Sequence, residues 1–265
     1  MKKITLILMV FVLIVSACKK DDETEEPEVL NPTAVQKGFT IEYTSTTCPT
    51  CGGTGGPLLH KYAADAPEGA IIALHVNGDH DPMCNNSLSY GFSSDRPSGG
   101  SIPSFWVGDT KTETSDEDAM KTLLASGDAV AGVDLKFNVA DGKMTVETLT
   151  KFFSSATGDY YLSVYIIENG VDGSSNAPEG YVQPGTSYSY PNDDYKHDFI
   201  MRACTVGNVY GELLVNNPEK DKEFSKTYTI PVDIDWKRNL QAIAVIWKLD
   251  NNATPSHVYV NSIRR

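Results

Sequence analysis

Two cysteines separated by two residues, Cys48 and Cys51, have the type and spacing best suited to chemistry in this chain of 265 residues. A thiolate of lowered pKa can attack a disulfide, and a neighbouring thiol can then resolve the mixed disulfide. In that reaction Cys48 is the attacking thiol and Cys51 the resolving thiol. The same pair can instead form a structural disulfide that closes a short loop. The sequence leaves these two roles equally open.

The residues on either side of this pair predict a strand followed by a helix. Residues 38–43 are rich in strand formers, and residues 57–64 have apolar side chains at helical spacing. A strand-to-helix junction is a typical setting for a redox Cys-x-x-Cys. Four glycines lie within residues 52–56, and each costs a helix interior about 1 kcal/mol relative to alanine. We therefore expect the helix to begin late, near Pro57.

Residues 102–108 place Pro103 directly before an apolar strand. Together with the Cys-x-x-Cys motif, these residues resemble the thioredoxin superfamily. The resemblance implies that the bond before Pro103 is cis and that this proline lies against the two cysteines. It also implies a buried acid six residues before the first cysteine, where Glu42 stands, as the proton acceptor of the resolving thiol. A glutamate that faces solvent is the alternative interpretation of Glu42.

We expect residues 33–129 to form this thioredoxin-like α/β domain. Residues 70–76 are a near-continuous apolar run, as in a strand that is covered on both faces. Residues 104–107 predict a further strand, and residues 86–92 a short helix. Residues 116–125 predict a helix whose acidic first turn complements the helix dipole.

Residues 130–265 predict an antiparallel all-β domain. Two strand patterns, at residues 133–139 and 144–150, flank an Asp-Gly pair that is typical of a tight hairpin turn. Further strands are predicted at residues 160–168, 198–204, 228–232, 239–248 and 257–263. Many short strands without helices favour an immunoglobulin-like β-sandwich. The expected fold class is therefore α/β followed by all-β.

The first residues of the chain predict export. A basic start precedes an apolar run at residues 4–15, about a dozen residues, which is too short to span a bilayer comfortably and suits a signal peptide. The small residues before Cys18 resemble a lipobox. This resemblance implies a lipoprotein signal peptide of residues 1–17, cleaved before Cys18, and lipidation of the Cys18 thiol.

Residues 18–32 then form an expected lipidated tether. The charged block at residues 19–28 cannot bury apolar surface and should be solvated. It also resembles the acidic export signal that directs lipoproteins of the Bacteroidetes type to the outer face of the outer membrane. A plain spacer is the alternative. The expected location is thus the outer membrane, at the cell surface, with the lipid on Cys18 as the membrane contact.

Three loose motifs in the second half extend the resemblance over nearly the whole mature chain. They are His-Asp-Phe-Ile-Met-Arg at residues 197–202, Tyr-Gly-Glu at residues 210–212 and Val-Tyr-Val-Asn at residues 258–261. With the lipoprotein signal and the Cys-x-x-Cys half, the chain resembles the Omp-twenty-eight-related outer-membrane lipoproteins. Membership would imply an outer-membrane or surface lipoprotein, but no settled biochemical activity.

Several function classes are disfavoured. A formal net charge of −13 argues against nucleic acid and anionic lipid surfaces as partners. No cofactor is predicted. Five residues of types that can bind a metal lie close together, at His75, Asp79, His80, Asp81 and Cys84. A structural zinc site usually has two tight ligand pairs, however, and the chain has one. We therefore predict no metal site.

Two more cysteines, Cys84 and Cys204, fall in different predicted domains. They can form a bridge between the domains or remain separate thiols, and the sequence gives no distance between them.

A non-enzymatic surface-binding or adhesion lipoprotein is the alternative function. A long loop at residues 176–196 carries four tyrosines, Tyr181, Tyr188, Tyr190 and Tyr195. Tyrosine offers large amphipathic contacts at low entropy cost, so this loop is a candidate surface for sugars or proteins. A loop that packs its tyrosines on its own sandwich explains the composition equally well. The partner is then a surface ligand, whereas the redox hypothesis requires a protein thiol or disulfide.

Overall fold

The computed structural model describes residues 29–93, 100–108, 110–112, 116–184, 194–205, 207–236, 239–250 and 257–265. The structure is mostly β-sheet, with 42% strand and 15% helix, which confirms the expectation of a β-rich chain. Among the described residues, no helix has the length and apolar character needed to cross a membrane. The predicted signal peptide and Cys18 lie outside the described residues.

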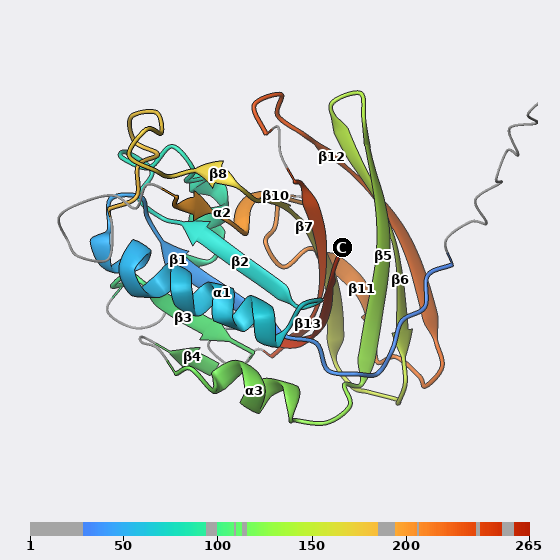
Figure 1. Cartoon of the computed structure of the whole chain (residues 1–265). Helices are drawn as coiled ribbons and strands as arrows, with labels where there is room; N and C mark the ends of the chain where they lie inside the picture. The colour runs from blue at the N-terminus through green and yellow to red at the C-terminus, as the bar shows by residue number, and fades with distance from the viewer. Residues whose placement is uncertain are drawn as a thin grey trace, which may run out of the picture.

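The first half of the chain contributes four neighbouring strands to the larger sheet. They are β1 (Phe39–Thr44), β2 (Ala70–His75), β3 (Ser104–Val107) and β4 (Thr110–Thr112), in the order β2-β1-β3-β4 (Figure 1). Strands β1 and β2 are parallel, whereas β3 is antiparallel to both β1 and β4. Every residue of β1 and β2 is buried, as the apolar run at residues 70–76 predicts.

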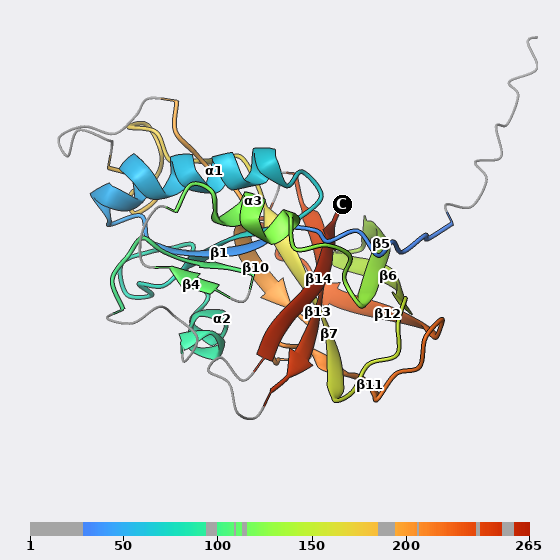
Figure 2. The ribbon, with the colours of Figure 1, turned by 90° about the horizontal axis from the view of Figure 1, so that it is seen from below.

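Helices cover both faces of these strands, as Figure 2 shows. Helices α1 (Gly56–Asp65) and α3 (Ala119–Leu124) pack on one face, where Tyr62 and Met120 join a core cluster with Phe105. Helix α2 (Asn86–Gly91) packs on the opposite face through Leu88. Because side chains alternate along a strand, neighbouring residues of β2 and β3 supply both clusters, whereas the apolar residues of β1 all belong to the cluster on the α2 side.

The larger sheet does not end at the predicted boundary after residue 129. Its nine strands continue from β2 through β10 (Ile200–Cys204) and β7 (Asp159–Glu168) to β13 (Gln241–Leu249) and β14 (His257–Arg264), with β11 (Glu212–Asn216) also on β7. The Ala73 N–H donates to the Phe199 carbonyl oxygen at 2.7 Å, at the junction of β2 and β10. This corrects the prediction that each half has a sheet of its own. An open edge of β2 would leave backbone groups unpaired, and β10 pairs with this edge at Ala73.

The second half also forms a separate sheet of three strands. They are β5 (Ala131–Ala140), β6 (Lys143–Phe152) and β12 (Glu223–Pro231), in the order β12-β6-β5. Asp141 and Gly142 turn the hairpin with φ of 50° and 70°, as the sequence predicts. The apolar face of this sheet packs on β7, β13 and β14. The arrangement is sandwich-like, but one layer of it is shared with the first half.

A small two-stranded sheet from the second half of the chain lies against the first half. Strands β8 (Val171–Asp172) and β9 (Lys196–His197) pair with each other. The His197 ring contacts the ring of His75 at the end of β2, with the ring centroids 5.7 Å apart. This contact places a segment of the second half beside the end of β1 and β2 from which the Cys-x-x-Cys motif follows.

Candidate functional site

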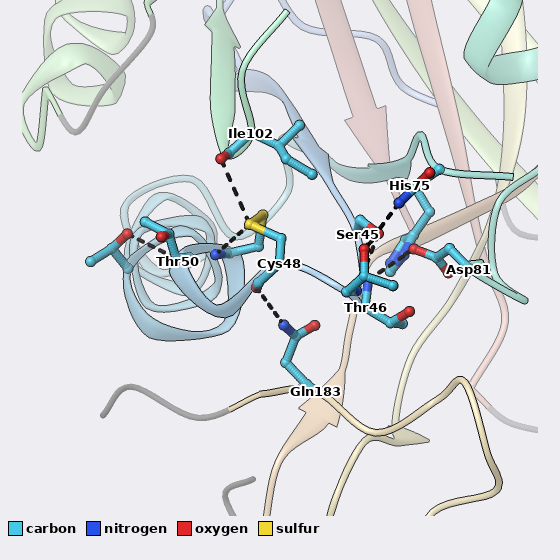
Figure 3. Close-up of a disulfide and its surroundings, with 12 residues drawn as sticks. Ser45, Thr46, Cys48, Thr50, His75, Asp81, Ile102 and Gln183 are labelled. Carbon is cyan, nitrogen blue, oxygen red and sulfur yellow. Dashed lines mark hydrogen bonds and ion pairs between the residues drawn. A yellow bond between two sulfur atoms is a disulfide. The ribbon is translucent and has the colours of Figure 1, made fainter. Parts of the chain in front are cut away.

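Cys48 and Cys51 form a disulfide directly after β1, with their Cα atoms 5.2 Å apart (Figure 3). The two sulfur-bearing residues differ in exposure, since Cys48 is half-buried whereas Cys51 is only 1% exposed. The Cys51 N–H lies 3.1 Å from the Cys48 Sγ. A molecule that approaches the disulfide from solvent therefore meets Cys48 first.

The helix begins at Pro49, directly after Cys48, and not near Pro57 as the glycines suggest. It passes through a π-helical turn, η1 (Cys51–Gly55), in which the Gly56 N–H donates to the Cys51 carbonyl oxygen. Tertiary contacts offset the poor helix propensity of glycine here. A side chain at Gly55 would collide with the Glu42 carboxylate and with Pro103, so this close approach requires glycine.

The loop before β3 lies against the disulfide. The Ile102–Pro103 peptide bond is cis. The carbonyl oxygen of Ile102 is 3.6 Å from the Cys48 Sγ, and Figure 3 shows it pointing at that sulfur. The structure thus brings together the cysteine motif and the proline loop, which are more than fifty residues apart in the sequence.

Glu42 is buried in β1, with 2% of its surface exposed, so the solvent-facing interpretation of this residue is wrong. Its Oε1 atom has no hydrogen-bond partner among the described residues. Burial raises the pKa of Glu42 to about 8, although a hydrogen bond with Thr44 opposes the shift. The Glu42 carboxylate lies against Gly55. Cys51 precedes Gly55 by about one turn and lies on the same side of the helix.

A segment of the second half covers the motif, which the sequence did not predict. The side-chain amide of Gln183 donates to the carbonyl oxygen of Cys48 at 2.9 Å (Figure 3). Gln183 itself is 2% exposed. A side chain at Gly52 would meet Gln183 and the carbonyl oxygen of Pro184. No local sequence pattern marks a glutamine in a long loop as the partner of a cysteine 135 residues away.

The described tyrosines of the predicted binding loop lie close to this site. Tyr195 is half-buried, and its hydroxyl approaches Gly56 in the first turn of α1. Burial, with the negative charges of Glu42 and Asp198, raises the pKa of Tyr195 well above its ordinary value. The carbonyl oxygen of Tyr181 is 2.8 Å from the His197 Nε2. The other two predicted residues, Tyr188 and Tyr190, lie outside the described residues.

A buried, hydrogen-bonded pair of side chains supports the turn that leads into the motif. The His75 Nδ1 is 2.7 Å from the Asp81 Oδ2, which also accepts the Thr46 N–H at 2.9 Å (Figure 3). Burial raises the pKa of Asp81, but the hydrogen bond and charge of His75 outweigh it, so the pKa is below its ordinary value. His80, in contrast, is exposed. Among the potential metal ligands at residues 75–84, His75 and Asp81 therefore bind each other and hold the turn at Thr46.

Cys84 and Cys204 are separate, half-buried thiols and not a bridge between the halves. Burial raises the pKa of both thiols, that of Cys204 to about 11. Because the thiolate is the nucleophile, neither has the lowered pKa of a reactive cysteine.

No family model and no curated protein matches this chain. Among solved structures, it is similar to a DUF3823 family protein from Bacteroides ovatus, with 12% identity over 52% of this chain and 56% of that chain, at a TM-score of 0.26. It is also similar to a penta-heme cytochrome c552 from Thermochromatium tepidum, with 8% identity over 70% of this chain and 52% of that chain, at a TM-score of 0.24. The chain spans about half the length of each, and likenesses at this level support no inference about function.

Proposed function

We propose that this chain is a thiol–disulfide oxidoreductase that uses Cys48 and Cys51, in a thioredoxin-like unit carried by a surface lipoprotein of the outer membrane. One observation carries the proposal. A half-buried cysteine, a fully buried partner cysteine, the Ile102–Pro103 loop and the buried carboxylate of Glu42 meet at the start of one helix. A structural disulfide requires neither the unequal exposure nor a buried acid beside it.

The arrangement of the first half supports a thioredoxin-like unit. Its strands follow the order β2-β1-β3-β4, with a parallel β1–β2 pair and antiparallel β3 and β4. Helices α1 and α3 share one face, and the cysteines lie between β1 and α1. A strand-to-helix junction of this kind is where a thioredoxin-type Cys-x-x-Cys motif is expected.

The reaction follows from the oxidised state of the pair. A substrate thiolate attacks the Cys48 Sγ, the Cys48–Cys51 bond breaks, and Cys51 leaves as a thiolate. A second substrate thiolate then attacks the substrate sulfur of the mixed disulfide and releases Cys48. Two electrons pass from the substrate dithiol, which leaves as a disulfide, to the protein. The reverse direction oxidises the protein at the expense of a substrate disulfide, and the relative reduction potentials decide between them.

Glu42 supplies the proton in this scheme. With a pKa of about 8, its carboxyl group is largely protonated at neutral pH. It can therefore donate to the Cys51 thiolate as that thiolate leaves. In the reverse direction the carboxylate takes the proton back from Cys51 and makes it a nucleophile.

The location rests on the N-terminal sequence. Lipidation of Cys18 would attach the chain to the outer membrane, and the acidic tether would lead from the lipid to the folded part. The substrates would then be thiols or disulfides of proteins in the same compartment.

Alkylation of the reduced protein tests the redox proposal. The Cys84→Ala, Cys204→Ala variant leaves only the two motif thiols in the folded part. We expect Cys48 to react at least about tenfold faster than Cys51 near neutral pH, with a pKa below the free-thiol value of about 8.5. The alternative, a surface-binding lipoprotein with a structural disulfide, predicts slow and equal alkylation and a reduction potential below about −300 mV. That outcome would exclude the enzyme.

A further inference from the structure

A broad hollow lies where the second half of the chain meets helix α1. Its volume is about 650 Å³, within the range of about 300–1,000 Å³ that is usual for small-molecule sites. His60 of α1 lines it on one side, and Asp198 and Phe199, just before β10, lie beside His60. The rest of the lining comes from the ends of β7, β13 and β14, and consists of Asn169, Asn239, Leu240, Gln241, Arg264 and Arg265. The described lining includes no residue of the Cys-x-x-Cys motif, so this hollow is separate from the redox site.

Arg264 is a buried cation in this lining. It stands at the end of β14 and has 9% of its surface exposed. Its Nη2 donates to the Pro67 carbonyl oxygen at 2.7 Å, but none of the described carboxylates forms an ion pair with it. Burial lowers the pKa of Arg264, and no neighbouring negative charge opposes the shift. Buried charges are normally paired, so this guanidinium lacks a counter-charge.

Two of the three guanidinium nitrogens of Arg264 have no hydrogen-bond partner among the described residues. The Nε is buried without a partner, and is therefore closed off from solvent. The Nη1 also lacks a partner, but it is not buried. Because the exposed part of Arg264 lines the hollow, a ligand there can reach the Nη1 donor.

The ring of Phe199 holds the guanidinium in position. The Arg264 Cζ lies 5.0 Å from the centre of this ring, and the His60 ring lies 5.5 Å from it. Phe199 has a φ of 61°, which is unusual for a bulky residue. Two hydrogen bonds fix this backbone, from the Phe199 N–H to the Asn169 Oδ1 at 2.9 Å and from the Ala73 N–H to the Phe199 carbonyl oxygen at 2.7 Å. Strained residues of this kind cluster at ligand sites, where a side chain must keep one position.

The other charged groups of the hollow are already engaged. Arg265 is paired with the carboxylates of Glu68 and Asp134. The Asp198 Oδ2 lies 3.4 Å from the His60 Nε2. The hollow therefore presents one cation without a counter-charge, and an acid nearby. An anion with a single charge suits this arrangement better than a dianion, which the acid would repel more strongly.

We propose that this hollow binds a small organic acid, and that Arg264 recognises its carboxylate group. A guanidinium is planar and forms strong, directional hydrogen bonds with a carboxylate. The bound carboxylate would supply the counter-charge that the buried cation lacks. The inference does not depend on the proposed redox function, since the two sites use different residues.

The test titrates the wild-type protein with N-acetylglycine, a small acid, and with N-acetylglycinamide, its uncharged analogue of similar shape. The readout is the Arg264 Nε–H signal in ¹⁵N nuclear magnetic resonance spectra, which reports on this guanidinium directly. We expect N-acetylglycine to shift the signal until it saturates, and the amide to leave it in place. No saturable shift with the acid, or equal shifts with both compounds, would overturn the proposal.

Inorganic phosphate is the third probe, because a guanidinium also binds phosphate. We expect phosphate to bind more weakly than N-acetylglycine, since the nearby Asp198 repels a dianion. Binding of phosphate that is as tight or tighter would overturn the assignment of the ligand as a carboxylate.

A pair of variants tests the role of Arg264 by calorimetry. Arg264→Met should weaken the binding of N-acetylglycine by at least about tenfold, because it removes the charged hydrogen-bond donors. Lys61→Met is the matched control, since it removes the same charge from α1 outside the hollow. Its affinity should stay within about twofold of wild type, because solvent screens a distant surface charge. An unchanged affinity of Arg264→Met, or an equal loss in Lys61→Met, would overturn the role of Arg264. The titration of the wild type decides the proposal even if Arg264→Met does not fold.

Discussion

Gln183 donates its side-chain amide to the backbone carbonyl of Cys48 across 135 residues of sequence, at 2.9 Å. The bond joins a loop of the second half to Cys48, the less buried cysteine of the motif. The same carbonyl also accepts from the backbone N–H groups of Cys51 and Gly52. The segment that covers the motif, at Gln183 and Pro184, is therefore hydrogen-bonded to Cys48, the cysteine that a substrate would attack in the proposed reaction.

Gln183→Leu should loosen this cover at a modest cost in stability. The Cys48 carbonyl keeps its two backbone donors, so we expect a loss of about 0.5–1.5 kcal/mol in the free energy of unfolding. Reduction of the disulfide by dithiothreitol should become faster, because Cys48 is more accessible. Gln183→Glu is the matched control of equal shape. It places a carboxylate against the carbonyl oxygen and should lose more stability at neutral than at acidic pH.

Glu42→Gln should change how stability depends on pH. The pKa of Glu42 is about 8 in the folded protein against an ordinary value of 4.5, which the unfolded chain should have, so between these pH values the folded state binds one more proton than the unfolded state. Wild-type stability therefore falls as pH rises through this window, by at most about 5 kcal/mol. The variant lacks this loss. Urea unfolding of both proteins near either end of the window should give equal stability at the acidic end and a more stable variant at the basic end. Parallel curves would show that Glu42 is not buried as described.

Gly55→Ala should destabilise the protein although alanine is the better helix former. The added methyl would meet the Glu42 carboxylate and the Pro103 ring, and overpacking of this kind costs about 1–3 kcal/mol. The control is Thr54→Ala, at an exposed position of the same turn, where we expect a change within about 0.5 kcal/mol. Thermal or urea unfolding of the two variants provides the measurement. A stabilised Gly55→Ala protein would contradict the close approach to Glu42.

A fragment of residues 29–129 should not fold alone. It would expose the edge of β2 that β10 covers, together with the part of the core where Phe39 contacts Trp247 and Tyr259. We expect the fragment to be unfolded or aggregated by circular dichroism and gel filtration. Co-expression with residues 130–265 is the control, and it should recover soluble protein. A cooperatively folded fragment would show that the shared sheet is not needed.

Cys18→Ala should release the protein from membranes, since a lipid on this thiol is the proposed attachment. Fractionation of cells that express the wild type and the variant measures the change. External protease should digest the native protein in intact cells if it is on the surface. A membrane-bound variant would argue against the lipid anchor, and a protected native protein against the surface location.

The sequence by itself determined the local elements with strong patterns. The Asp141-Gly142 turn produces the hairpin of β5 and β6, because few residues other than glycine and asparagine or aspartate adopt positive φ at both turn positions. The apolar run at residues 70–76 becomes the buried strand β2. The spacing of Cys48 and Cys51 allows one disulfide, and it forms.

Only the tertiary structure decided how these elements combine. The pairing of β10 with β2 depends on which backbone edge is left open once both halves have folded. The helix begins at Pro49 despite the glycines, because Gly55, Gly52 and Gly56 allow the close approach of Glu42, Gln183 and Tyr195, respectively. Local propensity amounts to about 1 kcal/mol per residue, and contacts between distant segments outweigh it. The burial of Glu42, and with it the chemistry of the site, follows from such contacts and has no local signature.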